Sequence, residues 1–463
     1  MTDLSDWAGG PVDGGIMGWK QTLENAGPGH WVLPKTKGMQ CEAHLFLSDA
    51  LLFGEDGGGG VEEDVFAQVV NACSFPGARR VVLTPDCHVG YGVPIGTAIE
   101  TEGTLLPTAA GYDIGCGMVQ LQTTLTWDDV ADKDKRRLWI DEVVRRIGVG
   151  MGQPGAGKGV LKKVNEIVRH GAKALGRGHD VAERAVVPVE DDGVDIPEQA
   201  WSKRNQLGSL GGGNHFCEMQ VDDDGKVWVM LHTGSRGFGW NIAKKFFVEG
   251  ARLLGLSGGR TEDRIWFDAG SRMGQAYWNL HNMAANFAIA NRLLIGAAVC
   301  EALEHVFGGE AKVYYEISHN LIQREGGRFV ARKGATRAFP KHHPALRDTA
   351  WHETGHPILI PGSMETGSAI LFAGEHAKDS LYSVNHGAGR RLSRTQAKKQ
   401  LDQKHTDLRM AKLGVVLNTR HTPLDESGPC YKDLDQVLGA VELAGLAHVA
   451  RRLKPVACIK GND

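Results

Sequence analysis

The chain has 463 residues, of which 42% are hydrophobic and 23% are charged. This composition is ordinary for a globular enzyme and excludes disorder as the default state. With 52 Lys and Arg against 55 Asp and Glu, the formal net charge is only −3. The whole-molecule charge therefore gives no sign of a polyanionic partner, and any nucleic-acid site has to be a local patch.

The predicted elements alternate between short β-branched runs and longer periodic helical stretches. In chain order, the strands are predicted at RVVLTP (80–85), VQLQTTL (119–125), KVWVMLHTG (226–234) and KVYYEIS (312–318). The helices are predicted at 134–147, 160–176, 240–255, 272–306, 393–403 and 433–450. This alternation predicts an α/β (α+β) fold, and we expect one catalytic domain.

The cysteines and the apolar runs indicate the cellular compartment that we expect for the protein. Eight cysteines are spread along the chain without a CxxC pair, and the sequence has no N-terminal apolar leader segment. The most apolar stretch, residues 288–303, contains Asn291, Arg292 and Glu301, which favours a buried helix over a membrane span. We therefore expect a reduced, cytoplasmic protein with no membrane partner.

Loops are predicted where glycine or polar residues gather. The chain has 62 glycines, many of them clustered at strand ends, where the backbone must pass close to something. GEDGGGG (54–60) is predicted to be a flexible surface loop, and residues 178–205 a loop insertion. GQPGAGKG (152–159) resembles a P-loop, but Gly159 replaces the Mg²⁺-binding Ser or Thr and the preceding segment is helix-like. A Gly-rich connector is the better interpretation.

Four short segments end a predicted strand or open a loop with metal-binding residue types. They are GYDIGCGM (111–118), GGGNHFCEM (211–219), LHTGSRG (231–237) and ISHN (317–320). Together they supply five candidate ligands, which are Asp113, Cys116, His215, His232 and His319. A single buried His or Cys is more often an ordinary core residue. Five such groups, each flanked by Gly, Ser or Asn instead of packing residues, favour a shared site.

The ligand types limit the ion and its use. A carboxylate with imidazoles suits manganese, iron or zinc, and one thiolate among them can bridge two ions. A structural zinc site would more often use several thiolates in CxxC pairs, which this chain lacks. The set therefore favours a catalytic site with positions left open for substrate.

Two further segments contain residues suited to binding phosphate or nucleic acid. VNHGAGRRLSR (384–394) places His386 before small residues and near Arg390 and Arg394, so a phosphate could approach the imidazole. His386 is thus a candidate nucleophile, although an exposed surface turn is the simpler interpretation of this segment alone. The stretch 324–347 has seven Lys or Arg against one acid and is a candidate nucleic-acid patch, although such a run is more often a solvated face.

These segments, taken in order, resemble those of one family, the RtcB RNA ligases. The resemblance rests on GYDIGCGM, GGGNHF with Glu218, HTGSRG, HN, RKGATRAFP (332–340), PGSM (361–364), HGAGR, YKD (431–433) and KPVACIKG (454–461). It runs from PDCHVGYGVPIG (85–96) to residue 461. It implies one large ligase domain over residues 1–463, with central β-sheets, surrounding helices and Gly-rich active-site loops.

The resemblance assigns roles residue by residue. It implies that Cys116 bridges two Mn²⁺ ions, one completed by Asp113 and His215 and the other by His232 and His319. His386 would attack the α-phosphate of GTP and carry GMP as a phosphoramidate. The guanylate pocket would comprise Asn214, Glu218, Ser363, Ser368, Gly387, Ala388, Gly389, Tyr431 and Lys460, with Glu218 and Lys460 on the guanine edge. Phosphate or RNA backbone would meet Arg236, Lys333, Arg390 and Arg394.

The implied reaction is the GTP- and Mn²⁺-dependent joining of RNA ends, as in tRNA splicing or RNA repair. A 2′,3′-cyclic phosphate is opened to a 3′-phosphate, GMP passes from His386 to that phosphate, and a 5′-hydroxyl displaces GMP. The implied partners are RNA with such ends and an archease-like activator protein. Two alternatives stay open, which are a metal-dependent cyclic phosphoesterase that does not ligate and an RNA-binding protein with a vestigial site.

Overall fold

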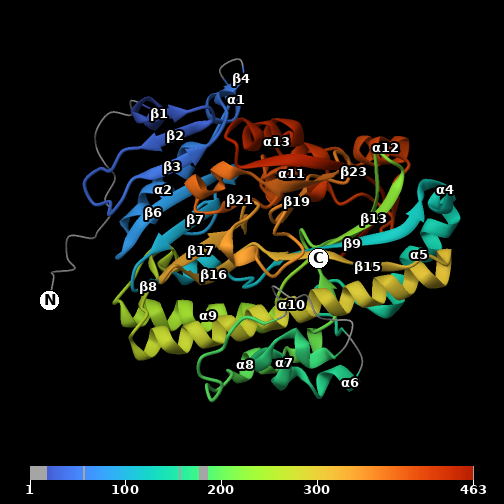
Figure 1. Ribbon diagram of the computed structural model, residues 1–463, viewed down its shortest axis with the longest axis horizontal. Helices are drawn as coiled ribbons and strands as arrows, with labels where there is room; N and C mark the ends of the chain where they lie inside the picture. Colours follow the sequence, from blue (N-terminus) through green and yellow to red (C-terminus); the bar gives the residue numbers. More distant parts are fainter. Residues whose placement is uncertain (1–17, 56–57, 156–157, 177–185, 462–463) are drawn as a thin grey trace.

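The protein folds into two large β-sheets with helices packed around them, as the computed structural model in Figure 1 shows. The structure describes residues 18–55, 58–155, 158–176 and 186–461. The prediction of an α/β (α+β) fold is confirmed. The single domain over residues 1–463 stays a prediction.

One large sheet has seven strands in the order β1-β2-β3-β6-β7-β17-β16. They are β1 (Glu24–Gly27), β2 (His30–Leu33), β3 (Ala43–Phe46), β6 (Ala78–His88), β7 (Ile95–Thr101), β17 (Arg328–Lys333) and β16 (Asn320–Glu325). Strand β6 is buried on both faces, because Val81 and Leu83 contribute to one hydrophobic core and Val82 to another. The buried end of β6 leads into the active-site region described below.

The other large sheet has the order β15-β9-β13-β12-β23-β20-β19, with β22 beside β23. Its strands are β15 (Ala311–Ser318), β9 (Gly117–Thr126), β13 (Lys226–Thr233), β12 (Phe216–Asp222), β23 (Ala447–Lys460), β20 (Ser368–Ala373), β19 (Pro357–Pro361) and β22 (Val416–Leu417). All neighbours are antiparallel except β22 and β23, which are parallel. This sheet carries most of the candidate ligands.

Helices cover the sheets. The longer ones are α2 (Glu63–Ser74), α5 (Lys133–Arg146), α7 (Val164–His170), α9 (Arg236–Leu253), α10 (Arg272–Phe307), α12 (Gln403–Leu413) and α13 (Leu434–Leu443). The short ones are α1 (Asp49–Phe53), α3 (Pro107–Ala110), α4 (Trp127–Val130), α6 (Lys158–Leu161), α8 (Glu198–Trp201) and α11 (Arg394–Gln400). In Figure 1, α9 and α10 lie side by side along one side of the molecule and α13 lies on the opposite side.

Helix α10 is the central helix of the fold. Its first turn is capped by Ser271, whose side chain accepts a hydrogen bond of 3.0 Å from the Gly274 N–H. Within the described residues it is the one helix long and apolar enough to cross a membrane, but 78% of its apolar window is buried inside the protein. The expectation of a buried helix at residues 288–303 is therefore confirmed.

The predicted elements agree with the structure in most places. All four predicted strands are present, and the helices expected at 134–147, 240–255 and 272–306 correspond to α5, α9 and α10. The stretch 160–176 is broken into the end of α6, α7 and a following 3₁₀ turn, Ala172–Leu175, and the stretch 393–403 covers α11 and the first residue of α12. The helix predicted over 433–450 is wrong in its last part, because α13 ends at Leu443 and β23 begins at Ala447.

The loop predictions have mixed outcomes. Residues 54–60 are not a simple loop, because β4 (Gly54–Glu55) pairs with β5 (Gly58–Gly59); residues 56–57 lie outside the described residues. In the stretch 178–205, residues 178–185 also lie outside them, residues 186–197 contain no helix or strand, and α8 follows. Whether that stretch is an insertion stays a prediction.

Candidate active site

The sheet order brings the candidate ligands together. Cys116 directly precedes β9, His232 lies near the end of β13, and His319 directly follows β15. Strand β9 lies between the other two, and Met118 is in register with both His232 and Ile317. His215 precedes β12, whose first residue is paired with His232. Four adjacent strands thus present their ligand-type side chains at one end of the sheet.

The approach of these strands requires glycine at position 117. A Cβ atom there would lie 2.2 Å from the Ile317 carbonyl oxygen, a distance that no side chain tolerates. The backbone next to Gly117 holds the same two segments together, since the His319 N–H donates to the Cys116 carbonyl at 2.8 Å. The Gly-flanked motif around Cys116 is therefore a packing requirement as well as a ligand signal.

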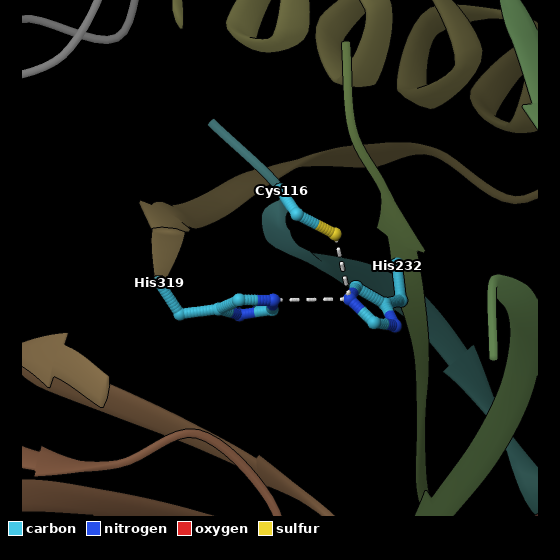
Figure 2. Close-up of side chains that lie close together, drawn as sticks. All are labelled: Cys116, His232 and His319. Atoms are coloured by element: carbon cyan, nitrogen blue, oxygen red, sulfur yellow. Dashed lines mark hydrogen bonds between the residues drawn. The ribbon is translucent and has the colours of Figure 1, made fainter. Parts of the chain in front are cut away.

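Two groups of three side chains share Cys116. In one, the Cys116 Sγ lies 3.2 Å from the His232 Nε2, which lies 3.2 Å from the His319 Nε2; Figure 2 shows these three side chains converging on one point. In the other, the Cys116 Sγ lies 3.5 Å from the His215 Nε2, which lies 3.1 Å from the Asp113 Oδ2. Within each group, all ligand atoms lie within 4.8 Å of one another. Because both groups include it, the Cys116 sulfur occupies the position of a bridging ligand.

The protonation states suit cation binding. Burial lowers the pKa of His232 and of His319 well below the ordinary value, so both imidazoles are neutral and can act as ligands. Although burial acts to raise it, the pKa of Asp113 is lowered by its hydrogen bond to His215, so the carboxylate is ionised. Burial raises the pKa of the Cys116 thiol well above its ordinary value. A cation in contact with that sulfur would favour the thiolate.

Backbone groups orient these side chains. The His215 Nδ1 lies 2.9 Å from the Leu210 carbonyl oxygen, and the His232 Nδ1 lies 3.1 Å from the Asn214 carbonyl oxygen. For His232 this contact favours the tautomer with the proton on Nδ1, which leaves Nε2 available to bind a cation, as outer partners of metal-binding histidines commonly do. The backbone N–H of Ser235 donates to the Asp113 Oδ1 at 3.0 Å.

One buried arginine of α10 links the ligand segments. The Arg292 guanidinium donates to the carbonyl oxygens of Gly115 at 2.6 Å and Thr233 at 3.0 Å, which precede Cys116 and follow His232. It also donates to the Ser318 Oγ at 2.8 Å, next to His319, and forms an ion pair with Glu316. Both Arg292 and Glu316 are fully buried. A single side chain therefore fixes three ligand-bearing segments relative to one another.

His386 lies beside this cluster. Its ring centroid is 4.7 Å from that of His319, and its Nδ1 lies 2.7 Å from an oxygen of the buried Asp86. The other Asp86 oxygen accepts a hydrogen bond of 2.7 Å from Thr84. Burial acts to raise the pKa of Asp86, but His386 and Thr84 hold it below its ordinary value. The ionised carboxylate favours the His386 proton on Nδ1, which leaves the Nε2 lone pair available.

Asp86 is absent from the sequence prediction, although it lies in the PDCH segment at the end of β6. A carboxylate that directly follows a run of buried strand residues, 81–85, is the signal that could have identified it. The contact depends on Gly389, which has a φ of 79° and whose Cβ position is 2.2 Å from the Asp86 carbonyl oxygen. Only glycine allows the HGAGR segment to pack this closely against β6.

A single cavity of about 500 Å³ joins these groups. It is lined by His386 and by four of the five predicted ligands, and His215 lies behind them in contact with Cys116. The predicted guanylate and phosphate residues that also line it are Asn214, Glu218, Lys333, Ser363, Ser368, Gly387, Ala388, Gly389, Arg390, Arg394, Tyr431 and Lys460. The structure thus brings almost the whole predicted set together.

The predicted guanylate end of the cavity contains paired charges. Burial raises the pKa of Glu218 to about 7, and the Gln220 side chain donates to this carboxylate at 2.7 Å. Lys460 and Tyr431 both donate to Glu426, at 3.0 Å and 2.7 Å. Glu426 also lines the cavity and is absent from the sequence prediction. It lies on a 3₁₀ turn, Leu424–Glu426, without a motif that would have indicated a site.

The four predicted phosphate or RNA contacts lie in different environments. Lys333 is buried, donates to the Tyr91 and Val93 carbonyl oxygens, and has its pKa lowered by burial to about 7. Arg390 and Arg394 lie next to Glu426. Arg236 does not line the cavity, because its guanidinium packs on Gly211 with one nitrogen 3.0 Å from the His215 Nδ1. The Arg236 charge therefore acts on the ligand cluster from outside the cavity.

The basic stretch 324–347 is not a free cationic patch. Arg324, Arg328 and Arg332 form ion pairs with Glu190, Glu100 and Glu325. Lys333 points into the cavity region instead of outward. Three of the seven Lys and Arg are therefore paired with neighbouring carboxylates, and contact of this stretch with nucleic acid stays a prediction. The described residues of 152–159 do not line the cavity either, in keeping with a connector.

An α+β scaffold places, in one cavity, a cluster of ligand-type side chains that shares the Cys116 thiol and a histidine oriented by a carboxylate, the arrangement of an enzyme active site. Comparison with known proteins identifies the family. The family model described as tRNA-splicing ligase RtcB matches residues 68–461, and the chain belongs to this family.

Relatives of this family match over nearly their whole length. The tRNA-splicing ligase RtcB of Thermococcus kodakarensis is 33% identical over 477 residues, covering 93% of this chain and 97% of that protein. The RNA-splicing ligase RtcB of Mycobacterium bovis is 34% identical over 434 residues, covering 85% and 100%. The tRNA-splicing ligase RtcB of Pyrobaculum aerophilum is 35% identical over 440 residues, covering 85% and 90%.

Proposed function

We propose that this protein is an RNA ligase that uses GTP and Mn²⁺ to join a 2′,3′-cyclic phosphate or 3′-phosphate end to a 5′-hydroxyl end. The observation that carries the proposal is the position of His386. Its Nδ1 is held by the buried Asp86, and its ring adjoins the Cys116 cluster in the cavity that also contains the predicted guanylate residues. Family membership supports the same activity.

The residues present are suited to two divalent cations. Asp113, Cys116 and His215 would hold one, and Cys116, His232 and His319 the other. Neutral imidazoles, one carboxylate and one thiol that can ionise form a donor set that accepts Mn²⁺. Bound there, the cations would neutralise phosphate charge and so reduce the repulsion that a phosphate presents to a nucleophile.

His386 is proposed to act as the nucleophile toward GTP. Asp86 holds the Nδ1 proton, so the Nε2 lone pair can attack the α-phosphorus while pyrophosphate leaves. The product is a His386–GMP phosphoramidate. As the imidazole becomes cationic during attack, the ionised Asp86 stabilises it.

The guanylate end is proposed to recognise the base. An ionised Glu218 would accept from the N–H donors of a guanine edge, and Lys460 would donate to its carbonyl. Both side chains are buried and line the cavity. Tyr431 offers a ring face there, with Arg390 5.2 Å from the ring centroid. Arg394, which is also at the cavity wall, would meet phosphate.

The remaining steps follow from phosphate chemistry. Water opens the cyclic phosphate to a 3′-phosphate, and a 3′-phosphate oxygen then displaces the His386 nitrogen from GMP. The 5′-hydroxyl attacks the 3′-phosphorus, loses its proton, and GMP leaves. Activation is necessary, because a phosphate monoester dianion has no adequate leaving group.

The proposal is tested by incubating the protein with Mn²⁺ and α-labelled GTP. Wild type is expected to form an acid-labile protein–GMP adduct, and His386→Ala is expected to form none. His376→Ala is a matched control, because His376 also contacts a carboxylate, Asp379 at 3.1 Å, but on the surface. An adduct in His386→Ala at wild-type yield would refute the assignment of the nucleophile.

Product analysis separates ligation from the phosphoesterase alternative. Labelled RNA with a 2′,3′-cyclic phosphate and a 5′-hydroxyl partner should give a longer product that depends on GTP. Opening of the cyclic phosphate without GTP consumption and without a longer product would favour the phosphoesterase. Binding of RNA with neither reaction would favour the vestigial site.

A further inference from the structure

One end of the cavity has no role in the chemistry described so far. Away from the guanylate residues, the cavity is lined by three aromatic side chains, Tyr91, Tyr112 and Phe247. Tyr91 is 55% exposed, which is unusual for an aromatic residue of a cavity wall. These rings adjoin the reacting groups through Lys333 and Gly334, because a Cβ at Gly334 would lie 3.0 Å from the His386 Cε1.

The aromatic surface extends from the cavity onto helix α9. The Tyr112 ring stacks on Trp240, with centroids 5.8 Å apart and planes 25° apart, and meets the edge of Phe247 at 4.8 Å. Trp240 is 42% exposed. Tyr112 and Phe247 therefore continue from the cavity wall to an open ring at the surface. We call Tyr91, Tyr112, Trp240 and Phe247 the aromatic platform.

Cations accompany the exposed rings. The Lys244 Nζ lies 5.0 Å from the Trp240 ring centroid, and the Arg260 guanidinium lies 5.5 Å from that of Tyr91. Lys333 lies beneath, hydrogen-bonded to the Tyr91 carbonyl oxygen. One carboxylate, Glu262, also lines this end and could accept from a base amine or a sugar hydroxyl. A partner that is purely apolar would not need a cation at each exposed ring.

We propose that the aromatic platform binds the unpaired nucleotides next to the RNA end that enters the cavity. The inference rests on the proposed function, since it takes the RNA phosphate to react at His386. Bases stack on aromatic rings whatever their sequence, and cations beside the rings neutralise the backbone phosphates. The platform therefore selects a single-stranded end over a base-paired end and does not select a sequence.

The test measures the affinity of a fluorescent, single-stranded, 3′-phosphorylated oligoribonucleotide by anisotropy. Loss of one stacking ring is expected to weaken binding by about tenfold in Trp240→Ala and in Tyr91→Ala. Trp240→Phe, which keeps a ring, should retain most of the affinity. A thermal unfolding midpoint within error of wild type shows that each variant is folded.

Trp127 provides the matched control. It is 41% exposed and has the Arg136 guanidinium 5.5 Å from its ring, but it lies on α4 and not at the cavity. Trp127→Ala should bind the oligoribonucleotide like wild type. Lys244→Ala should reduce the slope of log affinity against log salt by about one, because one phosphate contact is lost.

The outcomes distinguish this inference from the proposed function. If wild type forms the GMP adduct and binds RNA, but Trp240→Ala and Tyr91→Ala bind it equally well, the aromatic platform is refuted and the ligase proposal stands. Equal affinity of wild type for single-stranded and blunt duplex ends would also refute it. If wild type forms no GMP adduct, the proposed function is refuted, whatever the RNA affinities of the aromatic-platform variants.

Discussion

The ligand cluster and the guanylate end of the cavity are both buried, but they are held in different ways. At the cluster, neutral imidazoles are oriented by backbone carbonyls and the segments are fixed by Arg292. At the guanylate end, charged side chains hold one another, with Glu426 accepting from both Lys460 and Tyr431. The cluster is therefore preorganised, whereas in the proposed guanine complex Lys460 would have to exchange its partner Glu426 for the base.

This difference separates two kinds of substitution. Substitution of a residue that holds the ligand-bearing segments in place should lower both cation affinity and the free energy of unfolding, because the same hydrogen bonds contribute to both. A substitution at the guanylate end should act mainly by changing the local charge. The following predictions test this contrast.

The largest effect is expected for Arg292→Ala. It leaves Glu316 buried without its partner, which should lower the free energy of unfolding by about 3–5 kcal/mol. Urea denaturation measures this loss. The double variant Arg292→Leu, Glu316→Leu should recover most of the stability, because no buried charge stays unpaired. It should not recover cation affinity, since the links to the Cys116, His232 and His319 segments are gone; full recovery of Mn²⁺ affinity would contradict the positioning role.

Cys116→Ser is expected to weaken Mn²⁺ binding by more than about a hundredfold, measured by calorimetric titration. Loss of an outer partner alone commonly costs roughly 10–100-fold, and here a ligand shared by two groups is replaced by a hydroxyl that does not ionise near neutral pH. Cys217→Ser is the control, because Cys217 is equally buried but belongs to neither ligand group. Unchanged affinity in Cys116→Ser would contradict the bridge.

Asp86→Asn is expected to slow adduct formation by about 10–100-fold without preventing it. The amide can present its NH₂ to His386, which would favour the wrong tautomer and remove the charge that stabilises the imidazolium. Single-turnover rates with labelled GTP give the effect, and the pH dependence of the rate should change as well. A wild-type rate and profile would show that Asp86 only packs.

The effect expected for Glu218→Gln is on stability and depends on pH. Burial raises the pKa of Glu218 from 4.5 to about 7, so its contribution to stability is fully present below pH 4.5 and is lost as pH rises through about 7. Relative to wild type, the variant should therefore become more stable across this window, by about 3 kcal/mol for the whole shift. Urea denaturation of the ligand-free protein at pH values across the window measures it, with the exposed Glu102→Gln as control. A pH-independent difference would contradict the shift.

The residues of the cluster could be predicted from sequence because four of them lie in glycine-containing motifs and His319 lies between Ser318 and Asn320 instead of packing residues. Their convergence could not, since it depends on the strand order β15-β9-β13-β12, which joins segments far apart in the chain. Asp86 and Glu426 could not be predicted either, because their roles come from contacts with His386 and Lys460 across the fold. Residues 444–450 have helix-like spacing, but pairing of β23 with β20 overrides it.

Strand β23 has a consequence for how the protein reaches its native state. It lies between β12 and β20, so Phe216 is paired with Lys460 while Ser368 is paired with Leu453. These pairings span much of the chain, and the entropy of closing such long loops makes them late and slow events. We expect refolding to form the local β12-β13 hairpin first and the pairing of β12 with β23, which joins the most distant segments, late. The guanylate end, which needs Lys460 at the end of β23, should then be the last part to acquire structure.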